Sequence, residues 1–203
     1  AKLASFDNET KEFPKDAEIV IATQSILSRL DSVQFDLTAL LDFDQEISRA
    51  DYKSHHKIFS LLVNLKAMTR EIIFVQTSTP ESFILKCFKN NDTDGFYQKD
   101  LEFRRDLNLP PFQHLTALCV RGKEEKNVFE ESRQLLKMLE AQKEEKVELS
   151  DVHADHYPKW RDKYRYTILL KGESVKSILG TVKPALQNFK KKKGIIVTVN
   201  VDP

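Results

Sequence analysis

Short apolar runs bounded by polar residues predict three strands in the first part of the chain, at residues 18–23, 37–42 and 72–77. Runs of this kind are typical of strands that lie buried in a parallel sheet. Apolar residues at helical spacing predict a helix with Asp51 as its N-cap, and residues 78–81 are predicted to open another helix. The alternation of strand and helix predicts half of a doubly wound α/β domain.

A double proline predicts the boundary between two domains. Residues 93–107 have the pattern of a charged helix, which Pro110 and Pro111 must end. Beyond them the pattern is strand, helix, strand, strand, helix, strand, at residues 115–120, 124–143, 147–152, 164–170, 174–189 and 195–201. This order is that of the ferredoxin-like α+β fold. We therefore predict a first domain at residues 1–92, a linker at 93–112 and a second domain at 113–203.

Composition excludes several classes of protein. With 203 residues, 40% of them hydrophobic, and only 5 glycines and 7 prolines, the chain is neither disordered nor collagen-like. No apolar run approaches the roughly 20 residues of a membrane helix. Two cysteines, Cys87 and Cys119, do not form a disulfide framework or a zinc-ligand spacing. We expect a cytoplasmic α/β protein, and the lack of both a signal peptide and an initiator methionine indicates a fragment.

The net charge of +1 conceals an uneven distribution. Residues 157–203 hold eleven basic and three acidic side chains, a balance of +8, so residues 1–156 carry −7. A basic end on an acidic body indicates a surface that faces a polyanion, most simply nucleic acid. The alternative is a solvated lysine-rich surface without a specific partner.

Two segments of this basic end are candidate DNA-binding sites. The first spans Lys159, Trp160, Arg161, Lys163, Tyr164, Arg165 and Tyr166. Its basic and aromatic residues are those that phosphate contacts and base stacking require. In a strand, Lys163 and Arg165 share one face and the two tyrosines share the other, so the tyrosines could instead belong to the core. The second segment is the run Lys190, Lys191, Lys192 and Lys193.

The sequence contains no recognisable catalytic motif. It has no G-x-x-x-x-G-K-[ST] phosphate loop, no G-x-G-x-x-G fingerprint and no H-E-x-x-H pair. We therefore predict no catalytic residue, no metal site and no bound cofactor in this chain. Asp42 and Asp44 lie at the carboxyl end of a predicted strand, where ligand-facing carboxylates are found. Such acids also serve as ordinary helix caps.

Several stretches of the sequence, in the same order, resemble one family. Residues 96–105 followed by residues 109–112 are similar to the F-Y-x-x-E-L-x-x-R-R and P-P-F linker of the bacterial replication-restart helicases of the PriA family. Residues 164–170 are similar to its R-Y-R-x-x-x-L-L segment, and residues 199–203 to its terminal D-V-D-P.

The resemblance also extends upstream, into motor motifs. Thr23 and Gln24 stand where the family has its I-G-T-Q motif, and Asp42 and Asp44 match its D-x-D stretch. The resemblance implies a partial RecA-like second helicase lobe followed by a ferredoxin-like C-terminal domain. It also implies DNA, single-strand-binding protein and primosome proteins as partners. The ATP-binding lobe, the Mg²⁺ motif and the zinc-binding cysteines of this ATP-dependent 3′–5′ helicase family would lie outside the chain.

Two motor motifs depart from the family pattern. The family's G-T-Q-M-x-x-K-G corresponds to residues 22–29, which lack both glycines and the lysine. The family's arginine-bearing Q-V-A-G-R-A-G-R corresponds to residues 64–70, where Met68 replaces the first arginine and Arg70 is out of register. An arginine of this kind is commonly worth about 10³ or more in rate. We therefore assign no ATPase role to any residue, and we expect the chain to be inactive alone.

Two functions remain open on the sequence. The first is a C-terminal portion of a primosomal helicase that binds branched or single-stranded DNA through its basic end. The alternative is a non-catalytic protein-interaction module without a DNA role, in which the lysines only increase solubility.

Overall fold

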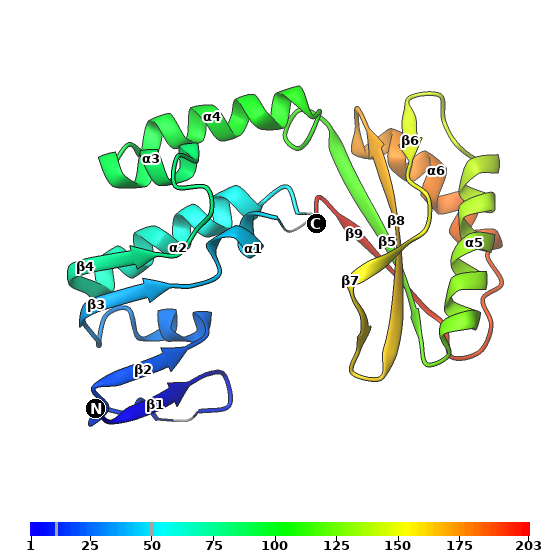
Figure 1. The fold of residues 1–203 in the computed structure, drawn as a ribbon. Helices are drawn as coiled ribbons and strands as arrows, with labels where there is room; N and C mark the ends of the chain where they lie inside the picture. Colours follow the sequence, from blue (N-terminus) through cyan, green and yellow to red (C-terminus); the bar gives the residue numbers. More distant parts are fainter. Residues whose placement is uncertain (11, 49–50) are drawn as a thin grey trace. The chain divides into compact units, whose positions relative to one another are not determined.

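The computed structural model describes residues 1–10, 12–48 and 51–203, apart from the side chains at 156 and 157. It contains two compact units, Ala1–Leu101 and Glu102–Pro203, each of which is described by itself. The chain passes from one unit to the other within α4 (Thr93–Asp106), inside the stretch that the sequence predicts as a linker. The protein is a mixed α/β structure (Figure 1).

The first unit is built from short parallel strands and helices. Before α4 it contains β1 (Leu3–Phe6), β2 (Ile19–Ala22), the 3-10 helix η1 (Gln24–Arg29), β3 (Phe35–Leu40), α1 (Phe43–Ile47), α2 (Ser54–Met68), β4 (Thr69–Val75) and α3 (Phe83–Asn90). The strands β1 and β2 pair in parallel, and so do β3 and β4, in two separate two-stranded sheets. The prediction of parallel strands is therefore confirmed for the pairs that form.

The prediction that these strands are buried is wrong for one of their faces. Large apolar side chains on the strands are 47–63% exposed: Leu3, Ile19, Ile21, Leu37, Ile72 and Phe74. Their neighbours Leu40 and Val75 point the other way and pack against a core that α2 and α3 supply. Within the described residues nothing comparable covers the opposite face, which is why alternate side chains remain exposed.

Two helices begin later than the sequence predicts. The residue before α2 is Lys53, and Asp51 lies one turn ahead of the helix, where its Oδ1 accepts a hydrogen bond from the Lys53 backbone N at 2.9 Å. The cap of α3 is Ser82, whose hydroxyl accepts a hydrogen bond from the Leu85 backbone N, rather than a residue of the predicted opening at 78–81. Aspartate and serine stabilise helix starts in the expected way, but at positions that the three-dimensional course of the chain selects.

A cluster of aromatic residues holds α4 in the first unit. Phe96 is fully buried and stacks on Phe59 of α2, with ring centroids 3.9 Å apart and planes inclined by 3°. The ring of Phe83 lies 6.0 Å from Phe96 on another side. Next to them, His55 Nδ1 of α2 lies 3.3 Å from the carboxylate of Asp100, which is 3% exposed. His55 therefore has a structural position between two helices.

The second unit contains the predicted order of strands and helices with one additional strand. Its elements are β5 (His114–Gly122), α5 (Glu125–Ala141), β6 (Val147–Leu149), β7 (His153–Trp160), β8 (Lys163–Gly172), α6 (Val175–Asn188) and β9 (Ile196–Val201). The order across the sheet is β6-β8-β5-β9, all neighbours are antiparallel, and β7 pairs with β8 beside β6. The predicted strand at 147–152 is therefore shorter in the structure, and the additional strand β7 begins directly after it.

Both long helices of the second unit lie on one face of this sheet (Figure 1). Along β5 every second residue is buried, including Leu118 and Val120, and on β8 Ile168 and Leu170 complete the same layer. Ser174 caps α6, as the sequence predicts, by accepting a hydrogen bond from the Ser177 backbone N at 3.1 Å. This one-sided core leaves the intervening side chains of the strands on the other face.

Candidate functional site

A β-hairpin carries the first basic segment. The strands β7 and β8 are joined by Arg161 and Asp162, whose φ angles are 48° and 58°, as in the type I′ turns that suit two-residue hairpins. Trp160 lies directly across from Lys163, and Lys159 lies across from Tyr164. Since directly opposed residues share one face of a sheet, Trp160 and Lys163 project to the same side. The side chain of Lys159 lies on the other, with its Nζ 5.6 Å from the Tyr164 ring centroid.

The two tyrosines of this segment belong to the helix-covered face. Tyr164 and Tyr166 pack against the hydrophobic core, and the Tyr166 ring lies 5.3 Å from Phe129 of α5. The Tyr166 hydroxyl donates a hydrogen bond to Glu125 Oε1 at 3.1 Å. Desolvation, together with this hydrogen bond, raises the pKa of Tyr166. Of the two alternatives that the sequence leaves open, the core position therefore holds for the tyrosines, and Trp160, 47% exposed, is the aromatic residue of the segment that reaches solvent.

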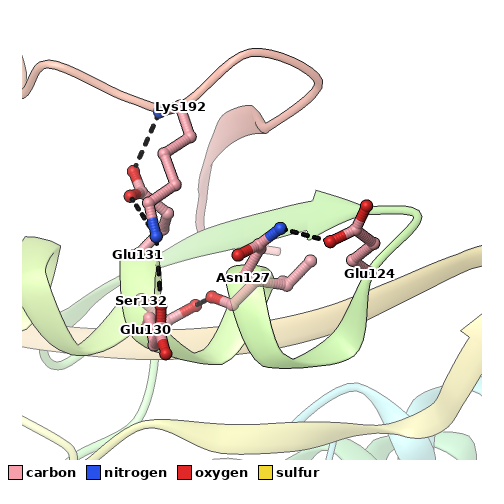
Figure 2. Close-up of polar contacts among 7 residues, drawn as sticks. Glu124, Asn127, Glu130, Glu131, Ser132 and Lys192 are labelled. Atoms are coloured by element: carbon pink, nitrogen blue, oxygen red, sulfur yellow. Dashed lines mark hydrogen bonds and ion pairs between the residues drawn. The ribbon is translucent and has the colours of Figure 1, made fainter.

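The lysine run lies in the connection between α6 and β9, and one of its lysines is held against α5 (Figure 2). The Lys192 backbone N donates to Glu131 Oε2 at 3.2 Å, and its Nζ donates to Glu130 Oε2 at 3.0 Å. Glu131 is only 2% exposed. The hydrogen bond between the two side chains raises the pKa of Lys192 and lowers that of Glu130. Lys192 thus fixes the connection to the helix.

The other three lysines of the run are exposed. Lys190, Lys191 and Lys193 take part in no ion pair within the described part of the chain. Their charges are therefore available to an external anion, whereas that of Lys192 is already compensated.

The sheet brings the two basic segments to the same end of the second unit. β8 begins at Lys163, β5 ends at Gly122 opposite Tyr164, and β9 begins at Ile196 opposite Arg121. A Cβ on Gly122 would meet Ile195 at 2.9 Å and the Gly194 carbonyl at 3.4 Å, so the end of β5 touches the connection that carries the lysines. The hairpin and the lysine run therefore converge, although about thirty residues separate them in the sequence.

This region contains one further basic residue, Arg121, that is not among those predicted from the sequence. It lies on β5 directly opposite Arg165 of β8. Across the sheet, the two arginines lie between the β7–β8 hairpin and the first residue of β9. The alternation of the strand 115–120, continued by one residue, indicates the side on which Arg121 lies. Its neighbour across the sheet depends on a register that the sequence alone does not reveal.

The motor-motif matches lie in the first unit and do not form one site. Thr23 caps η1 through a hydrogen bond that its Oγ1 accepts from the Ser25 backbone N, and Gln24 is the first residue of that helix. Asp42 and Asp44 instead line a cavity of about 430 Å³ beyond the carboxyl ends of β3 and β4, with Leu41, Gln45, Gln76, Thr77 and Ser78. The location agrees with the general rule for parallel strands, but Thr23 and Gln24 are not among its lining residues.

Asp44 joins the start of α1 to the loop after β4 at this cavity. Its Oδ1 accepts a hydrogen bond from Thr77 Oγ1 at 2.5 Å, and its Oδ2 accepts from the backbone N and the hydroxyl of Ser78, both at 2.7 Å. These donors, Thr77 first, lower the pKa of Asp44 from 3.8 to about 2. Asp44, in the first turn of α1, therefore ties the loop after β4 to this helix, while Asp42 makes no side-chain capping bond at the start of α1.

We expect Asp44 to make the stability of the first unit depend on pH. Because its pKa is lower in the folded state, its stabilising contribution is fully present above pH 3.8 and is lost as pH falls towards 2. Urea unfolding of the wild type and Asp44→Asn across this range measures the effect, with Asp42→Asn as the matched control. The wild type and Asp42→Asn should lose stability more steeply than Asp44→Asn, and equal slopes for all three would contradict this role.

Neither a membrane-spanning helix nor a metal cluster is found in the described part of the chain. None of its helices has the length and apolar character needed to cross a bilayer. Nor does it contain a group of three or more His, Cys, Asp or Glu side chains that could hold a metal ion.

Comparison with known proteins identifies the second unit most directly. Residues 105–203 match the family "Primosomal protein N C-terminal domain". This range includes every residue of the two basic segments and also Arg121.

Relatives extend the similarity to the first unit. "Replication restart protein PriA" of Thermotoga maritima is 31% identical over 92% of this chain, and that of Bacillus subtilis is 23% identical over 92%. The protein of the same name from Borreliella burgdorferi is 23% identical and covers 100% of the chain. The chain spans 24% to 31% of the length of these relatives. Among solved structures, the de novo designed protein Foldit4 is similar with a TM-score of 0.36 and 18% identity over 44% of this chain.

Proposed function

Since this chain is a C-terminal PriA-like region, we propose that it binds branched or single-stranded DNA and takes part in replication restart. The observation that carries this proposal is the convergence of the hairpin and the lysine run at one end of the second unit's sheet. A concentrated positive surface attracts the phosphate backbone and supplies affinity that does not depend on base sequence.

The proposed fold agrees with this function. Strand order β6-β8-β5-β9 with both helices on one face supports a ferredoxin-like second domain. Parallel pairing of β1 with β2 and of β3 with β4 supports part of a RecA-like second helicase lobe for the first unit. A single-strand-binding protein and primosome proteins are proposed as further partners, on the resemblance alone.

We assign no motor activity to this chain by itself. Asp44 is occupied by four hydrogen-bond donors of its own unit, and Thr23 caps η1. Met68, which replaces the first motif arginine, is fully buried, and Arg70 pairs with Asp36 at 3.2 Å. These positions support a chain that contributes DNA and partner binding, while ATP, Mg²⁺ and Zn²⁺ would belong to other parts of a full-length protein.

A second candidate function is a protein-interaction module without a DNA role. The exposed apolar side chains on β1 to β4, which include Ile21 and Phe74, favour it, because exposed apolar surface can mark a protein–protein interaction site. In this alternative the lysines serve solubility only.

Fluorescence anisotropy distinguishes the two functions. The full chain is titrated into a labelled fork, a duplex and a single strand, each over a series of salt concentrations. DNA binding through the basic end predicts that the logarithm of affinity falls linearly with the logarithm of salt concentration, by about 0.7 to 0.9 per phosphate contact. Preference for the fork or the single strand would support the proposal, and absence of binding to all three at low salt would favour the interaction module.

A further inference from the structure

The face of the second unit's sheet that no helix of this unit covers has its own pattern of side chains. Alternation along β5 and β8 directs to this face the residues between the buried ones: Leu115, Ala117, Cys119, Arg121, Lys163, Arg165, Thr167 and Leu169. Lys171, which belongs to the same face, donates from Nζ to the Leu107 carbonyl at 2.9 Å, so the linker contacts that end of it. The polar and basic residues lie at the opposite end, near the hairpin.

Two arginines face each other at this end. Arg121 and Arg165 are directly opposite in the antiparallel register of β5 and β8, and like charges in this relation destabilise a sheet. Both Nε atoms are buried and have no hydrogen-bond partner, and neither guanidinium takes part in an ion pair of the described residues. Buried donors normally have a hydrogen-bond acceptor, but the described residues supply none for these two Nε atoms.

Apart from Ile196 of β9, which is opposite Arg121, the neighbours of the arginines on this face are mainly polar, and the charge balance remains positive. Cys119 and Thr167 are opposite each other one step along the same face, and Thr198 of β9 is next to Cys119. Burial raises the pKa of the Cys119 thiol, which also senses the charges of Asp155, Arg165 and Arg121. Asp155 is thus one carboxylate near two arginines, and Lys163 adds a third positive charge on this face.

The residues of the hairpin favour nucleic acid over other polyanions. Lys163 and Arg165 are two positions apart on β8, so they follow each other along the face. Trp160 is opposite Lys163, projects to the same side and is 47% exposed. A row of cations beside an exposed aromatic ring is what a single strand requires, because the cations contact phosphates and the ring stacks on a base. An acidic peptide has carboxylates for the cations but no base to stack on the ring.

The geometry points to the open face of β5 and β8 as the binding site for the phosphodiester backbone of a single-stranded nucleic acid. Arg121 and Arg165 bind phosphate at its centre, because guanidinium groups donate two parallel hydrogen bonds to phosphate oxygens. Lys163 extends the path towards Trp160, which stacks on a base. This inference rests on the proposed function and adds to it the kind of nucleic acid, the face of the sheet and the residues that bind it.

A double variant, Arg121→Gln with Arg165→Gln, tests the site in the full chain. With labelled oligothymidylate, affinity should fall by about tenfold or more, and the salt dependence should become less steep by about 1.4, the value for two lost phosphate contacts of a single strand. The thermal midpoint should stay the same or rise, because repulsion between two like charges is removed. The matched control, Arg133→Gln with Lys137→Gln, removes two charges from α5 and should bind within about twofold of wild type.

The tryptophan fluorescence of the wild type gives a second readout that needs no variant. The chain has one tryptophan, Trp160, and stacking on a base should quench its emission in parallel with the rise in anisotropy. If the wild type binds oligothymidylate without quenching, or the double variant binds as well as wild type, the strand lies elsewhere and this inference is wrong while the proposed function stands. Absence of binding by the wild type contradicts the proposed function itself. If poly-glutamate displaces bound DNA equally well from the wild type and from the double variant, the proposed site is also wrong.

Discussion

Replacing Phe96 by alanine is expected to lower the free energy of unfolding of the first unit by about 3–5 kcal/mol, the usual cost of deleting a fully buried phenylalanine ring. Phe96 is 0% exposed and stacks on Phe59, and Phe83 closes another side. Its ring joins α4 to α2 and α3, so neighbouring side chains cannot fill the space without moving a helix.

Urea unfolding followed by circular dichroism measures this loss, and hydrogen exchange at the amides of α2 locates it. Leu101→Ala is the matched control, since Leu101 lies on the same helix and is 42% exposed. It should cost less than about 1 kcal/mol. Equal losses for the two variants would mean that helix propensity, rather than the aromatic cluster, determines the stability of α4.

Charge reversal of the three unpaired lysines, Lys190, Lys191 and Lys193→Glu, is expected to weaken DNA binding by a factor on the order of 10² at low salt. The salt dependence should become less steep by about 2 to 3, because each lost phosphate contact contributes about 0.7 to 0.9. The control reverses three other exposed lysines and changes the charge by the same amount: Lys137 of α5, Lys143 between α5 and β6, and Lys176 of α6. Equal weakening by both triple variants would show that net charge, not this surface, attracts DNA.

Lys192 should respond differently from its neighbours. Its ammonium already pairs with Glu130, and its backbone N is bound to the buried carboxylate of Glu131. Replacement of Lys192 by glutamate would place three acidic groups together, so we expect mainly a loss of stability. The structure thus divides a uniform run of four lysines into one structural residue and three exposed cations.

Helices and strands with a strong local pattern could be predicted from the sequence. The amphipathic pattern at 124–143 and 174–189 corresponds to α5 and α6, and Ser174 caps α6 as expected. Alternation along β8 assigned Lys163 and Arg165 to one face and the tyrosines to the other, because successive side chains of a strand point in opposite directions. These features depend on residues close in sequence, whose geometry the backbone itself determines.

The start of a helix was less predictable when several candidate caps lay close together. Ser78, Thr79 and Ser82 can all cap a helix, and the structure uses Ser82, while Thr77, Ser78 and Thr79 donate to Asp44 instead. The competing partner, Asp44, lies 34 positions before Ser78. A local rule cannot choose between two uses of a hydroxyl when one of the partners is distant in the chain.

By itself, the sequence determined most helices and strands of the second unit, the basic character of the C-terminal end and the family resemblance. Only the tertiary structure brought the lysine run to the hairpin, paired Arg121 with Arg165, and closed Lys192 onto Glu131, which is 61 positions away. The physical reason is that local patterning follows from backbone geometry, whereas cross-strand register and loop contacts depend on which distant segments bury their apolar faces together. The candidate site of this protein consists almost entirely of contacts of the second kind.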